Sequence, residues 1–99
     1  SVLNGKDVLP PTEKKTPAPQ SYEEGIFLFT TKTGPKCKVA IKWVKEANIP
    51  FKLIDAEENM KLARKYKVFL APTLVNCHNQ TIDTYTNLSN IRKFIDQQN

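Results

Sequence analysis

A cysteine lies at the end of a short polar loop, in the stretch TKTGPKC at residues 31–37. An apolar run at 26–29 precedes the loop, and apolar residues recur at helical spacing from Lys36 to Ala47, so the pattern predicts a strand followed by a helix. A proline in the first helical turn removes an N–H that would lack a partner. The remaining free N–H groups and the helix dipole place partial positive charge beside Cys37, which favours a thiolate. We therefore expect any chemistry to be centred on this loop.

A second cysteine, Cys77, is followed by the only histidine, His78. Two cysteines are too few for a secreted disulfide scaffold, and their spacing matches no short zinc signature, so a reducing, cytoplasmic compartment is expected. Two adjacent ligands with no second cluster make a poor metal site, so no metal is predicted and His78 is interpreted as a solvated turn residue.

The chain of 99 residues is long enough for one domain with one modest core. Residues 1–24 begin with a proline-rich stretch without hydrophobic periodicity, which predicts a linker or disordered tail. This segment fits a tail without a role and a tether to a preceding protein equally well. Residues 25–99 are the predicted domain, and they contain no apolar run long enough to cross a bilayer.

Within that domain the patterns predict the element order β-α-β-α-β-β-α. Two strand-helix-strand passages require right-handed crossovers, and the last two strands form a hairpin, which gives an α/β fold with a four-stranded mixed sheet flanked by three helices. The expected elements are strands at 26–30, 51–55, 73–75 and 81–85, helices at 36–47, after Asp55 and after Asn87, and a polar turn at 77–80.

Caps and buried faces follow from the same patterns. Asp55 is expected to cap the second helix together with Glu58, and Asn87 to cap the last helix. The inward faces are predicted to hold Val39, Ala40, Trp43, Val44 and Ala47 in the first helix, Met60, Leu62, Ala63 and Tyr66 in the second, and Leu88, Ile91, Phe94 and Ile95 in the third.

The formal net charge of +5 is concentrated around the loop and the helix that follows it. An acidic protein surface suits this charge better than nucleic acid, because aromatic and basic residues are not interleaved. A solvated helix face is the simpler alternative. Five lysines precede the first acidic residue of this region, Glu46: Lys32, Lys36, Lys38, Lys42 and Lys45.

The loop at 31–37 and the sequence APT at 71–73 resemble a glutaredoxin-like redoxin of the thioredoxin fold. That family carries Thr-Lys-x-Cys-Pro-x-Cys in the loop and a cis proline before the third strand, and the resemblance covers about residues 25 to 97. The stretches DAEEN (55–59), APTLV (71–75) and NLSNI (87–91) further resemble redoxin modules associated with bacterial ribonucleotide reductases.

The resemblance implies a monomeric thiol-disulfide oxidoreductase domain that passes electrons to a protein disulfide, with ribonucleotide reductase as the partner, in cis or in trans. A reductase of the thioredoxin reductase type or glutathione would recharge it, and no further cofactor is implied. A cysteine at position 34 would attack, Cys37 would resolve, Lys32 would favour the thiolate, and Pro72 would hold the substrate backbone. The substrate-binding residues would be Pro35, Lys36, Ala71, Pro72 and Thr73.

Gly34 departs from the family at the position of the nucleophile. Disulfide exchange needs one thiolate to attack and a second to displace the partner, so dithiol activity is expected to be lost or impaired. Three explanations stay open: a change made to trap or silence the domain, a natural scaffold, or one-thiol chemistry by Cys37, which burial in apolar surroundings would oppose. A non-catalytic protein-interaction module is the alternative function.

Three further possibilities are disfavoured: Cys77 as a substitute for the missing thiol, glutathione binding and a bound iron–sulfur cluster. Cys77 lies five residues beyond Pro72, about 16 Å along an extended strand, whereas disulfide partners need Cα atoms within about 7 Å. Glutathione binding is less well supported, because TNLSN at 86–90 replaces the Gly-Gly-x-x-Asp-type turn of many glutaredoxins. Binding of an iron–sulfur cluster would use the thiol missing at Gly34.

Overall fold

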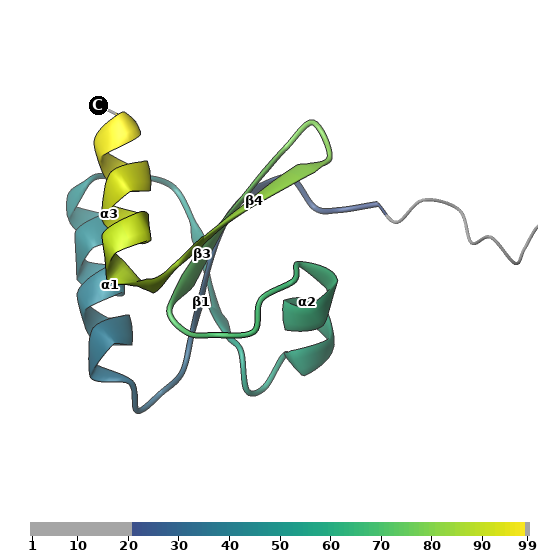
Figure 1. Cartoon of the computed structure of the whole chain (residues 1–99), viewed down its shortest axis with the longest axis horizontal. Coiled ribbons are helices and arrows are strands. Elements are labelled where there is room, and N and C mark those ends of the chain that lie inside the picture. Colours follow the sequence, from purple (N-terminus) through teal and green to yellow (C-terminus); the bar gives the residue numbers. More distant parts are fainter. Residues whose placement is uncertain (1–20, 99) are drawn as a thin grey trace, which may run out of the picture.

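The computed structural model describes residues 21–98, so the proline-rich stretch at 1–20 lies outside the described residues. The predicted element order is confirmed (Figure 1). The elements are β1 (Gly25–Thr30), α1 (Pro35–Glu46), β2 (Lys52–Asp55), α2 (Met60–Lys65), β3 (Thr73–His78), β4 (Thr81–Thr86) and α3 (Asn87–Gln97).

The four strands form one mixed sheet in the order β2-β1-β3-β4. Strand β1 is parallel to β2 and antiparallel to β3, and β3 is antiparallel to β4. The continuous apolar run of β1 is explained by this central position, because both of its faces are covered: Phe27, Leu28 and Phe29 are at most 2% exposed.

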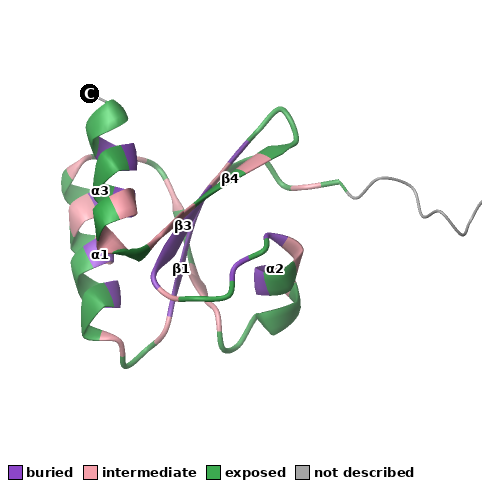
Figure 2. Ribbon diagram, in the orientation of Figure 1, coloured by how far each residue is buried: buried purple, intermediate pink, exposed green. Residues whose placement is uncertain are grey.

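Each face of the sheet has its own core, and the alternation of side chains along a strand assigns residues to one or the other. Phe27 and Phe29 pack with Tyr66 on the α2 side, whereas Leu28 packs with Val44 and Phe94 on the side covered by α1 and α3. Figure 2 shows the buried residues gathered on β1, β3 and the inward sides of the helices. The fold therefore has a helix pair on one face and a single short helix on the other.

Two residues predicted to face the core lie at its edge. Val39 is 37% exposed, because it lies about 100° around α1 from the buried Ala40. Met60 is 55% exposed, because α2 is only six residues long and begins at Met60, at the rim of the sheet. The other predicted core residues of the three helices are buried or partly buried.

The predicted cap at Asp55 is one turn too early. Asp55 Oδ1 accepts the N–H groups of Glu57 (2.9 Å) and Glu58 (3.3 Å), and so stabilises a turn that ends before α2 begins. Asn59 is the N-cap of α2 and makes no side-chain capping bond. At α3 the predicted cap is one residue too late: the N-cap is Thr86, which makes no side-chain capping bond. Asn87 is the first residue of α3, and its Oδ1 accepts the Asn90 N–H at 3.3 Å.

The third strand is longer than predicted. It continues to His78, and the hairpin turn contains only Asn79 and Gln80, both at positive φ (52° and 63°). Cys77, predicted to lie in the turn, is instead paired with Gly25 on one side and Ile82 on the other, and is 3% exposed. A buried free cysteine behaves as a small apolar residue, which accounts for its place in a strand.

The segment before β1, residues 21–24, is attached to the sheet, and we call it the N-terminal strap. The Glu24 carboxylate accepts the N–H groups of Asn79 (2.9 Å) and Gln80 (2.8 Å). The Tyr22 ring lies 5.5 Å from the Tyr66 ring between centroids. The strap therefore binds the hairpin turn and α2, at the end of β1 remote from the loop that follows Thr30.

Candidate functional site

The predicted loop joins the C-terminal end of β1 to the start of α1. Gly34 is the N-cap residue and Pro35 is at the start of the helix, where the missing N–H costs nothing. The Cys37 N–H donates to the Gly34 carbonyl oxygen at 3.1 Å. The first turn contains no acidic residue, so the partial positive charge of the helix end is not neutralised locally.

Cys37 is buried beneath this loop, with 2% of its surface exposed. Its sulfur accepts the Thr31 N–H at 3.4 Å, and the Thr31 hydroxyl oxygen lies 3.8 Å from it. The sulfur thus faces residues 31–34 and not solvent. A thiol in this place can attack a sulfur held at the neighbouring loop position, whereas a disulfide of another protein would reach it only with difficulty.

Gly34 has an ordinary extended backbone, φ −78° and ψ 118°, which any L-amino acid adopts. A Cβ built at this position would lie 3.6 Å from Cys37 Cβ and 3.0 Å from Cys37 Sγ. Disulfide-bonded cysteines have Cβ atoms about 3.5–4.5 Å apart. The same Cβ would lie 3.0 Å from Thr31 Oγ1, so the Thr31 side chain would have to shift slightly. The φ and ψ angles therefore do not require glycine, and the distances to Cys37 suit a sulfur pair between positions 34 and 37.

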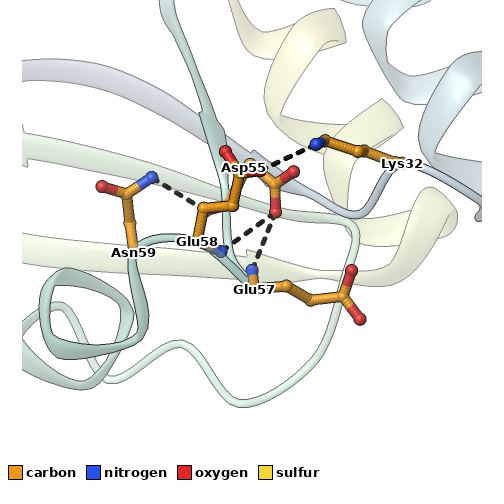
Figure 3. A network of polar contacts seen from close by, with 5 residues as sticks. All are labelled: Lys32, Asp55, Glu57, Glu58 and Asn59. Atoms are coloured by element: carbon orange, nitrogen blue, oxygen red, sulfur yellow. Dashed lines mark hydrogen bonds and ion pairs between the residues drawn. The ribbon is translucent and has the colours of Figure 1, made fainter.

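Lys32 is paired with Glu58 across the loop, with Nζ 2.7 Å from Oε2 (Figure 3). Glu58 lies in the turn whose N–H groups bind the Asp55 carboxylate. Asn59 Nδ2 donates to the Asp55 carbonyl oxygen at 3.0 Å and is the last member of this hydrogen-bond network. The Lys32 and Glu58 side chains are 71% and 62% exposed, so the pair contributes little to stability. The predicted influence of Lys32 on a thiolate thus depends on whether Glu58 holds its ammonium group.

The segment before β3 lies beside the loop. The Ala71–Pro72 peptide bond is cis, as the resemblance implied. Phe29 pairs with Thr73, so Pro72 is one position further along, opposite the end of β1. The Asn87 N–H donates to the Pro72 carbonyl oxygen at 3.1 Å, and the Thr73 hydroxyl donates to the Leu70 carbonyl oxygen at 2.8 Å. The structure thereby brings residues 71–73 together with residues 31–37.

An open pocket of about 560 Å³ extends from the loop to α2, with Thr31 and Ala71 in its wall. Three large apolar side chains that line it are exposed: Met60 (55%), Phe69 (78%) and Leu70 (65%). Sequence reasoning missed this pocket. Its only signal was the apolar run 68–70, which precedes Pro72 without belonging to a strand.

Cys77 is not part of this site. It pairs with Gly25, the first residue of β1, whereas the loop follows the last residue of that strand. Burial raises the pKa of the Cys77 thiol, and the Glu24 carboxylate, with an oxygen 3.7 Å from the sulfur, raises it further. Cys77 is therefore a protonated structural thiol. His78 is exposed and ends β3.

Within residues 21–98 no three histidine, cysteine or acidic side chains are grouped so as to hold a metal ion. None of the helices in this part of the chain is long and apolar enough to span a membrane.

Comparison with solved structures identifies the architecture. The chain is similar to the N-terminal domain of SasA from Synechococcus elongatus (TM-score 0.58, 20% identity, 82% of this chain and 86% of that one). It is also similar to thioredoxin 1 from Thermosipho africanus (TM-score 0.54, 17% identity, 75% and 97%) and to a malarial protein (TM-score 0.58, 21% identity, 74% and 92%). The domain has the thioredoxin fold. No protein-family model and no curated protein sequence matches it.

Proposed function

We propose that this domain is a redoxin whose loop geometry suits thiol-disulfide exchange with a protein disulfide. We further propose that the dithiol reaction is impaired because residue 34 is glycine. The observation that carries the proposal is the position of residue 34, whose Cβ would lie 3.6 Å from Cys37 Cβ at the start of α1. Disulfide-bonded cysteines typically have their Cβ atoms at such a distance. The N-cap conformation of residue 34 does not by itself demand it.

The reaction assigns one step to each loop position. A thiolate at position 34 attacks one sulfur of the partner disulfide, forms a mixed disulfide and releases the other partner sulfur as a thiolate. Cys37 Sγ then attacks the sulfur at position 34, which releases the partner's second thiol and leaves a disulfide between positions 34 and 37. An external dithiol reductase or glutathione returns that disulfide to two thiols. With Gly34 the first step has no sulfur to perform it.

The finer assignment is a glutaredoxin-like electron donor of the cytoplasm, with ribonucleotide reductase as the protein partner. It is supported by the sequence at 31–37 and by the motifs at 55–59, 71–75 and 87–91. Residues 71–73, beside the loop, would hold the partner backbone, and Pro35 and Lys36 would contact it from the helix side.

Restoring a sulfur at position 34 tests the proposal. We expect Gly34→Cys to form an internal disulfide with Cys37 on mild oxidation, detected by mass spectrometry as the loss of two hydrogens, and to reduce a model protein disulfide faster than the parent chain by orders of magnitude. Gly34→Ser is the matched control, with a side chain of similar size and no thiol. If Gly34→Cys folds but neither forms the disulfide nor gains activity over Gly34→Ser, the redox assignment fails.

The second candidate function, a non-catalytic interaction module, is favoured by the pocket beside Ala71. Exposed Met60, Phe69 and Leu70 are suited to an apolar side chain of a peptide lying along residues 71–73. Partner capture by the parent chain that survives Cys37→Ser but is lost with Phe69→Ser would favour this function over exchange chemistry.

A further inference from the structure

We propose that the outer face of α1 is a docking surface for an acidic segment of the partner protein. We call it the lysine face, and it consists of Lys38, Lys42 and Lys45. Lys38, Lys42 and Lys45 follow the i, i+4, i+7 spacing that places side chains in one stripe along a helix. All three are exposed, and none forms an ion pair with another residue in the range 21–98.

Near the start of α1, helix stability disfavours a lysine, whereas Lys45, in the last turn, is favoured by the helix dipole. Lys36 and Lys38 are in the first turns of α1, beside the positive end of its dipole, and no acidic residue occurs there. Lys38 and Lys42 are four residues apart, so their like charges repel across one turn. The inward residues Cys37, Ala40 and Val44 hold the helix on the sheet without their help. Where a sequence opposes local stability in this way, a function is the expected reason.

The lysine face begins at the candidate site. Lys38 follows Cys37 directly and lies in the first turns of α1, so an acidic segment next to a partner's disulfide would meet the lysines while its sulfur approached position 34. Charge of one sign around a site raises the rate of encounter with a partner of opposite sign. That the partner carries a disulfide follows from the proposed function, whereas the docking surface itself is inferred from α1 alone.

The same face lacks the features of a nucleic-acid surface. Trp43, the aromatic residue of α1, is partly buried and packs against the core, with the Arg92 guanidinium 5.3 Å from its ring centre. It therefore offers no free ring on which a base could stack. On the neighbouring helix α3, Arg92 pairs with Asp96 at 3.4 Å, and Lys93 adds one exposed positive charge.

Binding can be measured without thiol chemistry. The probe is a fluorescent peptide of alternating glutamate and glycine without cysteine, followed by anisotropy at low ionic strength. We expect Lys38→Glu/Lys42→Glu to weaken binding about fivefold or more, and added salt to weaken binding to the parent chain. The matched control is Lys61→Glu/Lys67→Glu, which makes the same charge change on exposed residues of α2 and the turn after it. Equal losses in both variants, or no binding by the parent chain, would overturn the proposal.

Three further measurements sharpen the test. Lys38→Glu alone should raise the midpoint of thermal unfolding, because it removes a repulsion and places a carboxylate near the helix start; a lower midpoint would overturn the argument from helix stability. Lys38→Gln/Lys42→Gln, which removes charge without reversing it, should also weaken peptide binding. Tighter binding of duplex DNA than of the acidic peptide, at equal ionic strength, would assign the face to nucleic acid and overturn the proposal.

The link to exchange chemistry is tested separately in the Gly34→Cys background. Disulfide-linked peptides with flanking glutamates should form mixed disulfides faster than peptides with flanking lysines, and the difference should vanish in high salt. Equal rates would show that the lysine face does not select the partner. Absence of reaction with both peptides would instead contradict the proposed function, while the anisotropy result still decides whether the face binds acidic segments.

Discussion

At the scale of single residues, the two sulfur atoms occupy chemically different places. Cys37 lies at the start of a helix, and its sulfur accepts a hydrogen bond from the Thr31 N–H in the loop. Cys77 lies within a strand, hydrogen-bonded to the Glu24 carboxylate, which keeps its thiol protonated. Both are buried, so exposure alone would not distinguish them. The distinction comes from the neighbouring groups: the helix start beside Cys37 favours a thiolate, whereas the carboxylate beside Cys77 disfavours one.

The Lys32–Glu58 pair allows a prediction about the charge at the loop. In the Gly34→Cys background, Glu58→Gln should release the Lys32 ammonium and increase the alkylation rate by iodoacetamide slightly below neutral pH, whereas Lys32→Gln should decrease it. The change should be at most about fivefold, because exposed ion pairs contribute roughly 0–1 kcal/mol. Glu57→Gln, on the same turn and without a side-chain ion pair in the described part of the chain, is the control. Identical rates in all variants would remove Lys32 from the site.

At the scale of elements, α2 is the helix whose stability depends most on tertiary contacts. It has six residues, its N-cap makes no side-chain bond, and it contacts the sheet mainly through Ala63 and the following Tyr66. An isolated helix of this length is unstable in water, so its place depends on tertiary contacts. The Tyr66 ring lies between the strap and β1, 5.5 Å from Tyr22 and 5.2 Å from Phe27.

Tyr66→Phe should therefore loosen α2 and the strap together. The Tyr66 hydroxyl donates to the Glu23 carbonyl oxygen and accepts the Glu23 N–H, each at 3.0 Å. Loss of both bonds should lower the free energy of unfolding by about 1–3 kcal/mol, measured by urea denaturation. Tyr85→Phe is the control, because its ring also packs on a phenylalanine but its hydroxyl forms no bond in the described range. Equal losses in the two variants would contradict the role of Tyr66.

At the scale of the whole molecule, Glu24 ties residues far apart in the chain. Hydrogen bonds from the Gln80 and Asn79 N–H groups hold the pKa of Glu24 below its usual value of 4.5. A carboxyl group whose folded pKa is lowered stabilises the fold fully above its unfolded pKa, and this contribution is lost as the pH falls through the folded value.

Glu24→Gln should consequently be less stable than the parent chain at neutral pH, and the difference should shrink as the pH falls below 4.5. Denaturant unfolding of both proteins over this range measures it. The comparison with Glu57→Gln controls for the general loss of an acidic charge. A difference that stays constant down to low pH would show that the Glu24 charge is not the cause.

The sequence alone was sufficient for the element order, for the central position of β1 and, apart from Val39, for the buried faces of α1 and α3, because these features produce periodic or continuous apolar patterns. It failed where contacts span the chain. Nothing near Cys77 indicates that Gly25 and Glu24 will extend its strand, and nothing near Met60 indicates that α2 will begin there. The loop was found from local residue types, whereas the pocket beside it requires Thr31, Met60 and Phe69 to meet in space.

The attachment of the strap has a practical consequence. Tyr22 and Glu24 are hydrogen-bonded to the hairpin turn, at the end of the sheet remote from residues 31–37. A linkage introduced just before Ser21 would therefore attach the domain at the end opposite to this loop. A protein immobilised on a sensor surface in this way would present its sulfur-bearing loop outward to an analyte. A linkage on the outer side of α1 would cover that approach.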